Sequence, residues 1–261
     1  MKFNSTLLAT IIASASLLSS WQTQAMSEAP VPISDDYKAM TFNIRDKEPE
    51  TDAGNEIWKN RFGAVNEISV FAMSEKGLQQ ITNPSAIFLS NENLSAPGSM
   101  VMVTREATRP LLIEVQALVD QANGAPKRIC VGMDQNRLAL QLAILHKHGG
   151  IVTFDQDVFI NVVGGMKVSE TASDLVVMLA IVSSLRDKVI PKDWIAFGEV
   201  GLAGEVRPVY NAQERLSEAQ KQGFKLAIVP KANVPKKPLK GIKVIAVERL
   251  SEALDHLSEN T

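Results

Sequence analysis

A polar turn between a β-branched stretch and a long apolar stretch is the part of this chain where chemistry is most expected. Residues 158–163 are rich in valine and isoleucine, the turn reads SETASD over residues 169–174, and an apolar segment follows as far as Arg186. A strand that leads into a helix N-terminus exposes backbone N–H groups that can bind an anion or an oxyanion. The first question is therefore whether this turn also carries a nucleophile.

The residues around this turn follow the order of a known proteolytic domain. A strand, the SETASD turn, an apolar helix, a glycine-rich hairpin and a helix containing AQERLSEA resemble the Lon protease family. In active members of that family the turn carries G-P-S-A-G, in which the serine is the nucleophile. A lysine near the start of the later helix is its general base. The resemblance places these two roles on Ala172 and Gln213.

Neither Ala172 nor Gln213 can perform its expected role. Alanine has no attacking atom, and the glutamine amide does not titrate near neutral pH, so it cannot accept a serine proton. Ser173 is one residue out of register, which on a helix turns its side chain by about 100° from the required direction. Ser169 precedes the turn. We therefore expect an inactive peptidase site, and a peptidase with a shifted serine is the alternative.

A second candidate site is the basic pentapeptide formed by Lys59, Asn60, Arg61, Phe62 and Gly63. Two cations beside an amide and a glycine suit contact with DNA phosphates, although a loop of this kind can also be a solvated turn. The same pentapeptide is a signature of the bacterial DNA repair family RadA, also called Sms. Residues 59–96 resemble the terminal strands of that family's RecA-like ATPase core, and residues 97–261 resemble its Lon-like domain.

The resemblance to this family implies DNA binding and assembly into a ring. RadA proteins resemble hexameric ATP-driven motors for branch migration in recombinational DNA repair, with a recombinase as a further partner. The family's zinc finger and Walker A lysine do not occur in this sequence. We therefore expect no cofactor in this chain, with ATP and zinc implied only for the full-length family, and we leave open whether the chain is an enzyme. The expected partners are single- or double-stranded DNA, bound independently of sequence and strongly dependent on salt, and further copies of the chain, but no membrane.

Two groups of basic residues elsewhere are further candidates for DNA contact. The net charge is −2, so no global basic field attracts nucleic acid, and aromatic residues make up only 5%, so base stacking is not indicated. We expect Lys236 and Lys237 to contact DNA, although basic loops are usually solvated faces. The first group is a proline-interrupted loop with Lys231, Lys236, Lys237, Lys240 and Lys243, and the second contains Arg105, Arg109, Lys127, Arg128 and Arg137.

No metal or dinucleotide site is expected. Glycines 198, 201 and 204 do not form a G-x-G-x-x-G turn and predict a hairpin with close packing instead. His146 and His148 lie at a helix end without a carboxylate at ligand spacing, and His256 is isolated. The single cysteine, Cys130, excludes a disulfide within the chain and a Cys-only zinc site, and its apolar surroundings predict a small core residue.

The pattern of apolar residues, glycines and prolines predicts an α/β (α+β) fold, because strands and helices are mixed along the chain. Strands are expected at residues 67–73, 78–81, 100–103, 111–118, 127–131, 158–163, 225–229 and 242–247, with a hairpin over 194–200 and 204–209. Helices are expected at residues 136–148, after the SETASD turn, at 213–222 and at 251–257, the last with Ser251 as its N-cap.

The first 58 residues differ in character from the rest. They hold four Lys/Arg and eight Asp/Glu, against 23 and 21 in the remainder by subtraction from the totals of 27 and 29. Residues 1–25 resemble a secretory signal peptide. Residues 26–58 contain the strand-like MTFNIR, and a W-x-x-R pattern at Trp58 and Arg61 ends the segment. Both resemble the secreted endonuclease/exonuclease/phosphatase family, which would place Asn43 in a metal–phosphate site.

We therefore expect four segments, at residues 1–25, 26–58, 59–96 and 97–261, and a poorly ordered second segment without a working nuclease. The alternative function is a hydrolase, either a Mg²⁺-dependent nuclease or phosphatase or a Lon-type serine peptidase. The leader favours export, whereas the RadA resemblance favours the cytoplasm. The sequence leaves open whether the join at residues 58–62 is biological or an assembly artefact, whether the leader is cleaved, and whether this chain binds DNA or forms rings.

Overall fold

The computed structural model of the chain describes residues 39–41, 70–74, 77–80, 89, 96–106 and 109–260. The chain divides into residues 1–37 and residues 38–261, and all described residues lie in the second unit. The signal-like leader, Asn43 and the pentapeptide at residues 59–63 lie outside the described residues. The expected boundaries at residues 25, 58 and 96 stay predictions.

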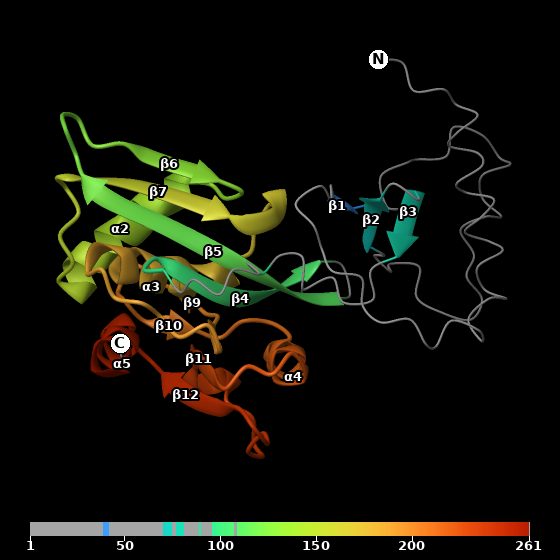
Figure 1. Cartoon of the computed structure of the whole chain (residues 1–261). Coiled ribbons are helices and arrows are strands. Elements are labelled where there is room, and N and C mark those ends of the chain that lie inside the picture. The colour runs from blue at the N-terminus through green and yellow to red at the C-terminus, as the bar shows by residue number, and fades with distance from the viewer. Residues whose placement is uncertain are drawn as a thin grey trace, which may run out of the picture. The chain divides into compact units, whose positions relative to one another are not determined.

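A seven-stranded sheet is the framework of residues 96–260, with the strand order β12-β11-β8-β4-β5-β7-β6 (Figure 1). Strand β5 pairs antiparallel with β4 and β7, whereas the other neighbours pair parallel. Six strands of this sheet therefore point one way and β5 points the other, which confirms the mixed α/β prediction. The strands are β4 (Ser99–Glu106), β5 (Arg109–Gln121), β6 (Arg128–Val131), β7 (Gln156–Val162), β8 (Trp194–Ala196), β11 (Leu226–Pro230) and β12 (Lys243–Val247).

Helices cover both faces of this sheet. Helices α2, α3 and α5 share a hydrophobic cluster with Met100 and Ile113 of the central strands. Helix α4 packs instead with Val101 and Leu112, the neighbouring residues of the same strands. Because successive side chains of a strand point to opposite faces, α4 covers the face opposite to the other three helices. The α-helices within the described residues are α2 (Gln135–Gly149), α3 (Asp174–Leu185), α4 (Ala212–Lys221) and α5 (Leu250–Asn260).

Helix α3 runs through the core, as the apolar segment predicted. Residues 174–183 are all buried, because apolar side chains occupy every side of the helix. The helix ends at Leu185, and Asp187 then adopts a left-handed conformation with φ 52°. It has 12 residues, and no helix in the described part of the chain is long and apolar enough to cross a membrane.

The hairpin expected over residues 194–209 is shorter than predicted. It consists of β9 (Glu199–Val200) and β10 (Val206–Arg207), whereas β8 pairs in the large sheet with β11 and β4. The chain leaves the sheet at Gly198, whose N–H donates to the carbonyl of Ala172 at 2.9 Å. The carbonyl of Gly198 accepts the N–H of Leu175 at 3.1 Å. These two bonds attach residue 198 to the first turn of α3 and prevent a longer hairpin.

The expected close packing of the hairpin glycines is confirmed. A Cβ at Gly198 would lie 3.0 Å from Cγ1 of Val206, and a Cβ at Gly201 would lie 2.0 Å from a carboxylate oxygen of Glu205. Gly204 has a φ of 76°, a conformation that other residues rarely adopt. These glycines let the hairpin approach its neighbours.

One local prediction is wrong and another holds in part. Ser251 is not the N-cap of α5, because the helix already begins at Leu250, and the Glu252 carboxylate instead accepts the N–H of Glu248 at 2.8 Å. Cys130 packs against the core cluster as expected, but it is only half-buried, because β6 lies at the edge of the sheet. Burial still raises the pKa of the Cys130 thiol, which disfavours the reactive thiolate.

Three short strands form a separate antiparallel sheet in the order β1-β2-β3. They are β1 (Ala39–Thr41), β2 (Val70–Ser74) and β3 (Gly77–Gln80). The strands expected at 67–73 and 78–81 are thus present with shifted ends, and the strand expected at 40–45 is described only as β1. Ala39 pairs with Ala72. This pair joins residues 26–58 and 59–96, two segments for which the sequence analysis gave resemblances to different families.

The packing of α5 on β8 makes stability dependent on pH. The His256 ring stacks on Trp194, with centroids 5.4 Å apart and 23° between the ring planes. Burial lowers the pKa of the His256 imidazole, and the charge of Lys243 lowers it further. The unfolded chain therefore takes up a proton below about pH 6.5 more readily than the folded chain. The stability due to the neutral ring is present above that pH and is lost as the pH falls.

We predict that the melting temperature of the wild type falls more between about pH 8 and about pH 5.5 than that of His256→Phe. The phenylalanine keeps a ring against Trp194 but cannot take up a proton. Thermal unfolding followed by circular dichroism at both pH values measures the difference. Equal decreases in the two proteins would contradict this role of His256.

Candidate functional site

The carboxyl edge of the parallel strands collects Ala172, Gln213 and the lysines expected to bind DNA, the candidate residues that the structure describes. Strands β4, β8 and β11 run parallel, so their C-terminal ends lie at one edge of the sheet. The short helix η5 (Thr171–Ser173) is bonded to residue 198 just after β8, and η6 (Lys231–Asn233) follows β11 directly. Ligands of open α/β sheets bind at this edge, because loops leave the strands there.

Neither Ala172 nor Ser173 of the η5 turn offers an available nucleophile. Ala172 is buried, and its side chain packs in the cluster beneath α4. Ser173 is also buried, and its hydroxyl donates to the carbonyl of Glu170 at 2.8 Å. A hydroxyl used in this way is neither exposed nor beside a base, so the geometry opposes the alternative of a shifted serine nucleophile.

Gln213 lies exposed in the first turn of α4 and supports a loop instead of a nucleophile. Its side-chain amide donates to the backbone carbonyl of Asn233 at 3.1 Å. Asn233 ends η6, so this bond connects α4 to the segment that follows β11. The two positions expected from the peptidase resemblance, Ala172 and Gln213, therefore have separate structural roles.

A buried ion pair between Arg215 and Glu170 connects three elements at the carboxyl edge. The Arg215 side chain is 4% exposed, and its guanidinium contacts the two Glu170 oxygens at 3.0 and 2.5 Å. It also donates to the carbonyl of Val103 on β4 and to that of Tyr210. Arg215 thus fixes α4, β4 and the residue that precedes η5. The sequence analysis did not single out this arginine.

A second buried ion pair, between Asp174 and Arg137, fixes the start of α3. Asp174 is 2% exposed, and Arg137 donates to its two carboxylate oxygens from Nε and Nη2, both at 2.6 Å. The Gln141 amide at 2.8 Å and the Val200 N–H at 3.1 Å complete four hydrogen bonds to this carboxylate. These hydrogen bonds to Asp174 raise the pKa of the Arg137 guanidinium. In the sequence, the signal for this site was an acidic residue, Asp174, at the start of an apolar helix.

The second basic group predicted from the sequence is not one surface. Arg137 is engaged with Asp174, and the Arg128 guanidinium donates to the carbonyl of Thr153 at 2.6 Å. Arg105 lies beside the start of β5, whereas Lys127 and Arg128 lie near its far end, where Gln121 pairs with Gln156. A strand of 13 residues spans roughly 40 Å, which separates the two ends of this group.

The lysine loop, residues 231–243, presents the expected cations. All five of its lysines are exposed, including Lys236 and Lys237, and the segment has no acidic residue. Its start is fixed by Asn233, whose side chain accepts the Val209 N–H at 2.8 Å and donates to the Val209 carbonyl at 3.1 Å. Its end is fixed by the Gln220 amide, which donates to the Lys240 carbonyl at 2.6 Å. Lys231 pairs with Glu248 at 3.1 Å, a bond between exposed groups.

Within the described residues no group of histidine, cysteine and carboxylate side chains could hold a metal ion. His148 lies near the end of α2, and its Nε2 is 2.9 Å from the carbonyl of Leu202. This contact gives the residue a role in attaching the hairpin. The histidine therefore has a structural contact and lies in no group of possible metal ligands among the described residues.

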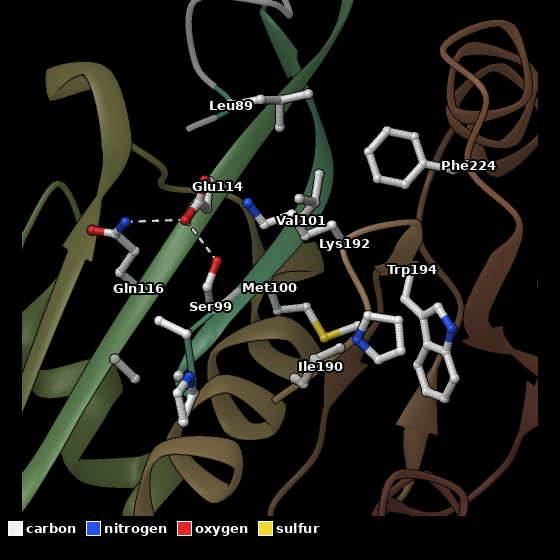
Figure 2. Close-up of a pocket in the computed structure, with 15 residues that line it drawn as sticks. Leu89, Ser99, Met100, Val101, Glu114, Gln116, Ile190, Lys192, Trp194 and Phe224 are labelled. Atoms are coloured by element: carbon white, nitrogen blue, oxygen red, sulfur yellow. Dashed lines mark hydrogen bonds between the residues drawn. The ribbon is translucent and has the colours of Figure 1, made fainter. Parts of the chain in front are cut away.

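A recess of about 470 Å³ lies at the opposite edge of the sheet, near the starts of β4 and β8. Figure 2 shows Glu114 on one wall, joined to Ser99 and Gln116, with Phe224 and Trp194 across from it. Ser99 donates to the Glu114 carboxylate at 2.6 Å and Gln116 donates at 3.0 Å. The recess has the size of a small-molecule site. However, Leu89 of this chain already forms part of its lining and packs on the cluster beneath α4. Leu89 thus forms one wall of the recess, and the Ser99 hydroxyl and the Glu114 carboxylate lie within hydrogen-bond reach of each other on another.

Comparison with known proteins gives consistent matches for most of the chain. A family profile described as "Subunit ChlI of Mg-chelatase" matches residues 119–233. The chain is 62% identical over 202 residues to the DNA repair protein RadA of Pseudomonas aeruginosa, which is 77% of this chain and 45% of that protein. It is 61% identical over 197 residues to RadA of Escherichia coli and 44% identical over 199 residues to RadA of Bacillus subtilis. Each of these two matches covers 75% of this chain and 43% of the relative.

The strand order defines a mixed α/β domain, in which Ala172 and Gln213 do not form a nucleophile–base pair. The matched three quarters of the chain belong to the RadA family of DNA repair proteins. The chain spans less than half the length of these relatives. The matches give no support to a nuclease-family origin of residues 26–58.

We predict that Asp174→Asn destabilises the fold by about 3 kcal/mol, because it leaves Arg137 without its charge partner and places a donor amide against donors. Urea unfolding followed by tryptophan fluorescence measures the change. The control is Glu248→Gln, which removes a carboxylate from an exposed pair and should change stability by less than about 1 kcal/mol. A small effect for both variants would show that the carboxylate of Asp174 does not fix the start of α3.

Proposed function

We propose that this chain is the DNA-binding and ring-forming part of a DNA repair protein, and that its lysine loop contacts DNA phosphates. The observation that carries this proposal is the loop itself, which holds five exposed lysines and no acidic residue at positions 231–243. The names of the RadA relatives support a role in DNA repair. Lys236 and Lys237 are the residues expected to make the contacts.

The attachment of the loop suits binding to a regular row of phosphates. Hydrogen bonds at Asn233 and Lys240 fix both ends of the segment, so less chain entropy is lost when DNA binds. Lys236 and Lys237 lie between these two points. Lysine contacts to phosphate carry no base information, so binding is independent of sequence and weakens as salt increases. The pentapeptide at residues 59–63 remains a second predicted contact.

We predict that Lys236→Gln/Lys237→Gln weakens binding to both single- and double-stranded DNA. The slope of log affinity against log salt should become less negative by roughly one to two, since up to two phosphate contacts are lost. Fluorescence anisotropy with labelled DNA at several salt concentrations measures both quantities.

The control for this prediction is Lys147→Gln/Lys167→Gln, which removes the same charge from two exposed lysines outside the loop. Its salt slope should stay near that of the wild type. Equal weakening by the two double variants would mean that only net charge matters. No binding by the wild type in low salt would refute the DNA-binding proposal.

We also propose that residues 97–261 form a Lon-like domain without peptidase activity. The support is local and chemical. Ala172 offers no attacking atom, the Ser173 hydroxyl is bonded to Glu170, and the Gln213 amide is bonded to Asn233. A peptidase of this type needs a nucleophile and a base within hydrogen-bond reach of each other.

We predict that a fluorophosphonate probe labels neither the wild type nor Ser173→Ala, because no hydroxyl in the turn is activated. Gel fluorescence after incubation measures the labelling, with an active serine protease in the same buffer as the positive control. Labelling of the wild type that disappears in Ser173→Ala would instead support a serine peptidase.

The context of the full-length relatives adds proposals about assembly and location. We infer that this chain works beside an ATP-driven motor in a homo-oligomeric ring, and that ATP and zinc bind elsewhere in the full-length family. A role on chromosomal DNA favours the cytoplasm over export. Branch migration and a recombinase partner belong to the same set of proposals, which the RadA resemblance motivates.

A further inference from the structure

Tyr210 projects from the segment between β10 and α4, and its side chain is exposed to an unusual degree. The residue is 90% exposed, and its ring makes no stacking contact within the described residues. Burying such a ring would release a large apolar surface from water. An aromatic ring held in solvent is therefore available to a partner.

The backbone that carries Tyr210 is fixed on both sides. Val209 exchanges two hydrogen bonds with the Asn233 side chain, at 2.8 and 3.1 Å. The Tyr210 carbonyl accepts a hydrogen bond from Nε of the buried Arg215 at 3.1 Å. Asn211 then adopts a left-handed conformation with φ 58° and donates from its side chain to Glu214 at 2.8 Å. The ring is thus exposed on a rigid support.

The same hydrogen bonds place Tyr210 beside the lysine loop. Asn233, which bonds to the residue before Tyr210, is three positions before Lys236. Three residues of chain span at most about 10 Å, so Lys236 lies within that distance of Asn233. A phosphate on Lys236 or Lys237 and a base on the Tyr210 ring can therefore belong to the same short stretch of nucleic acid.

We propose that Tyr210 stacks on an unpaired base of single-stranded DNA whose phosphates lie on Lys236 and Lys237. In a duplex both faces of each base are covered by its neighbours, whereas an unpaired base can present a face to an aromatic side chain. The ring therefore selects single-stranded DNA, and the lysines serve either form. This inference rests on the proposed DNA-binding function of the loop and adds the strand preference.

The test uses the full chain and two fluorescent probes, oligo(dT) of roughly 20 nucleotides and a mixed-sequence duplex of the same length. Tyr210→Ala should weaken oligo(dT) binding roughly tenfold and change duplex binding by less than about twofold, with an unchanged salt slope. Tyr210→Phe should bind oligo(dT) like the wild type, because it keeps the ring. Thermal unfolding of each variant checks that the fold is retained, as expected for a side chain in solvent.

Phe154→Ala is the matched control. Phe154 is 74% exposed and lies in the segment between α2 and β7. Strands β7 and β6 form one end of the strand order in the large sheet, whereas β11 and β12 form the other end. Its loss should leave both affinities unchanged.

The outcomes separate this inference from the function on which it rests. A wild type that binds neither probe would overturn both. A wild type that binds DNA through Lys236 and Lys237, with Tyr210→Ala equal to wild type on oligo(dT), would overturn the stacking role alone. Equal weakening on oligo(dT) and duplex would also overturn it, since a stacking ring acts only on unpaired bases.

Discussion

Helix α3 is surrounded by protein along most of its length, so its first turn has no bulk water to complete its hydrogen bonds. Backbone carbonyls meet part of this constraint, since the Leu175 N–H donates to Gly198 and the Asp174 N–H donates to Thr171. The Asp174 carboxylate at the helix start in turn accepts four hydrogen bonds from Arg137, Gln141 and Val200. These donors come from α2 and from the hairpin strand β9. The burial of one apolar helix thus fixes the positions of two neighbouring elements, and with them the edge of the sheet that carries the candidate residues.

The turn before α3 shows how a catalytic framework can serve a structural purpose. A strand, a polar turn and a helix N-terminus can support a nucleophile, yet here alanine occupies the expected position. The neighbouring charges are committed to structure, because Glu170 pairs with the buried Arg215. A buried pair of this kind is weak evidence for stability, but it fixes geometry, since either partner alone would be left as an uncompensated charge. The result is a rigid carboxyl edge from which the lysine loop and Tyr210 project.

The two edges of the sheet differ in the partners they suit. The carboxyl edge presents exposed cations on a loop that is attached at Asn233, and its positive charge suits a polyanion. The opposite edge has an apolar recess with a hydrogen-bonded carboxylate, Glu114, and Leu89 of the same chain lies in its wall. The two edges therefore differ in charge and in polarity.

Several features were determined by the sequence alone. The pattern of apolar residues and glycines predicted the buried α3, the helix ended by Gly150, and the positions of most strands of the large sheet, because these depend on local propensity and burial. The residue types at 172 and 213 predicted an inactive peptidase site, because alanine has no attacking atom, and this stays a prediction. The exposure of Lys236 and Lys237 also followed from a charged, proline-interrupted stretch.

Other features were decided only by tertiary structure. The second basic group is divided because β5 holds its members far apart. Arg137 is engaged in an ion pair because Asp174 lies opposite to it, although the two residues are distant in sequence. The low aromatic content argued against base stacking, but composition is an average and says nothing about where one ring lies. Arg215 and Asn233 place Tyr210 beside the lysine loop through contacts between separate segments. Pairings of this kind depend on the packing of the whole domain, and a linear pattern of residue types does not contain them.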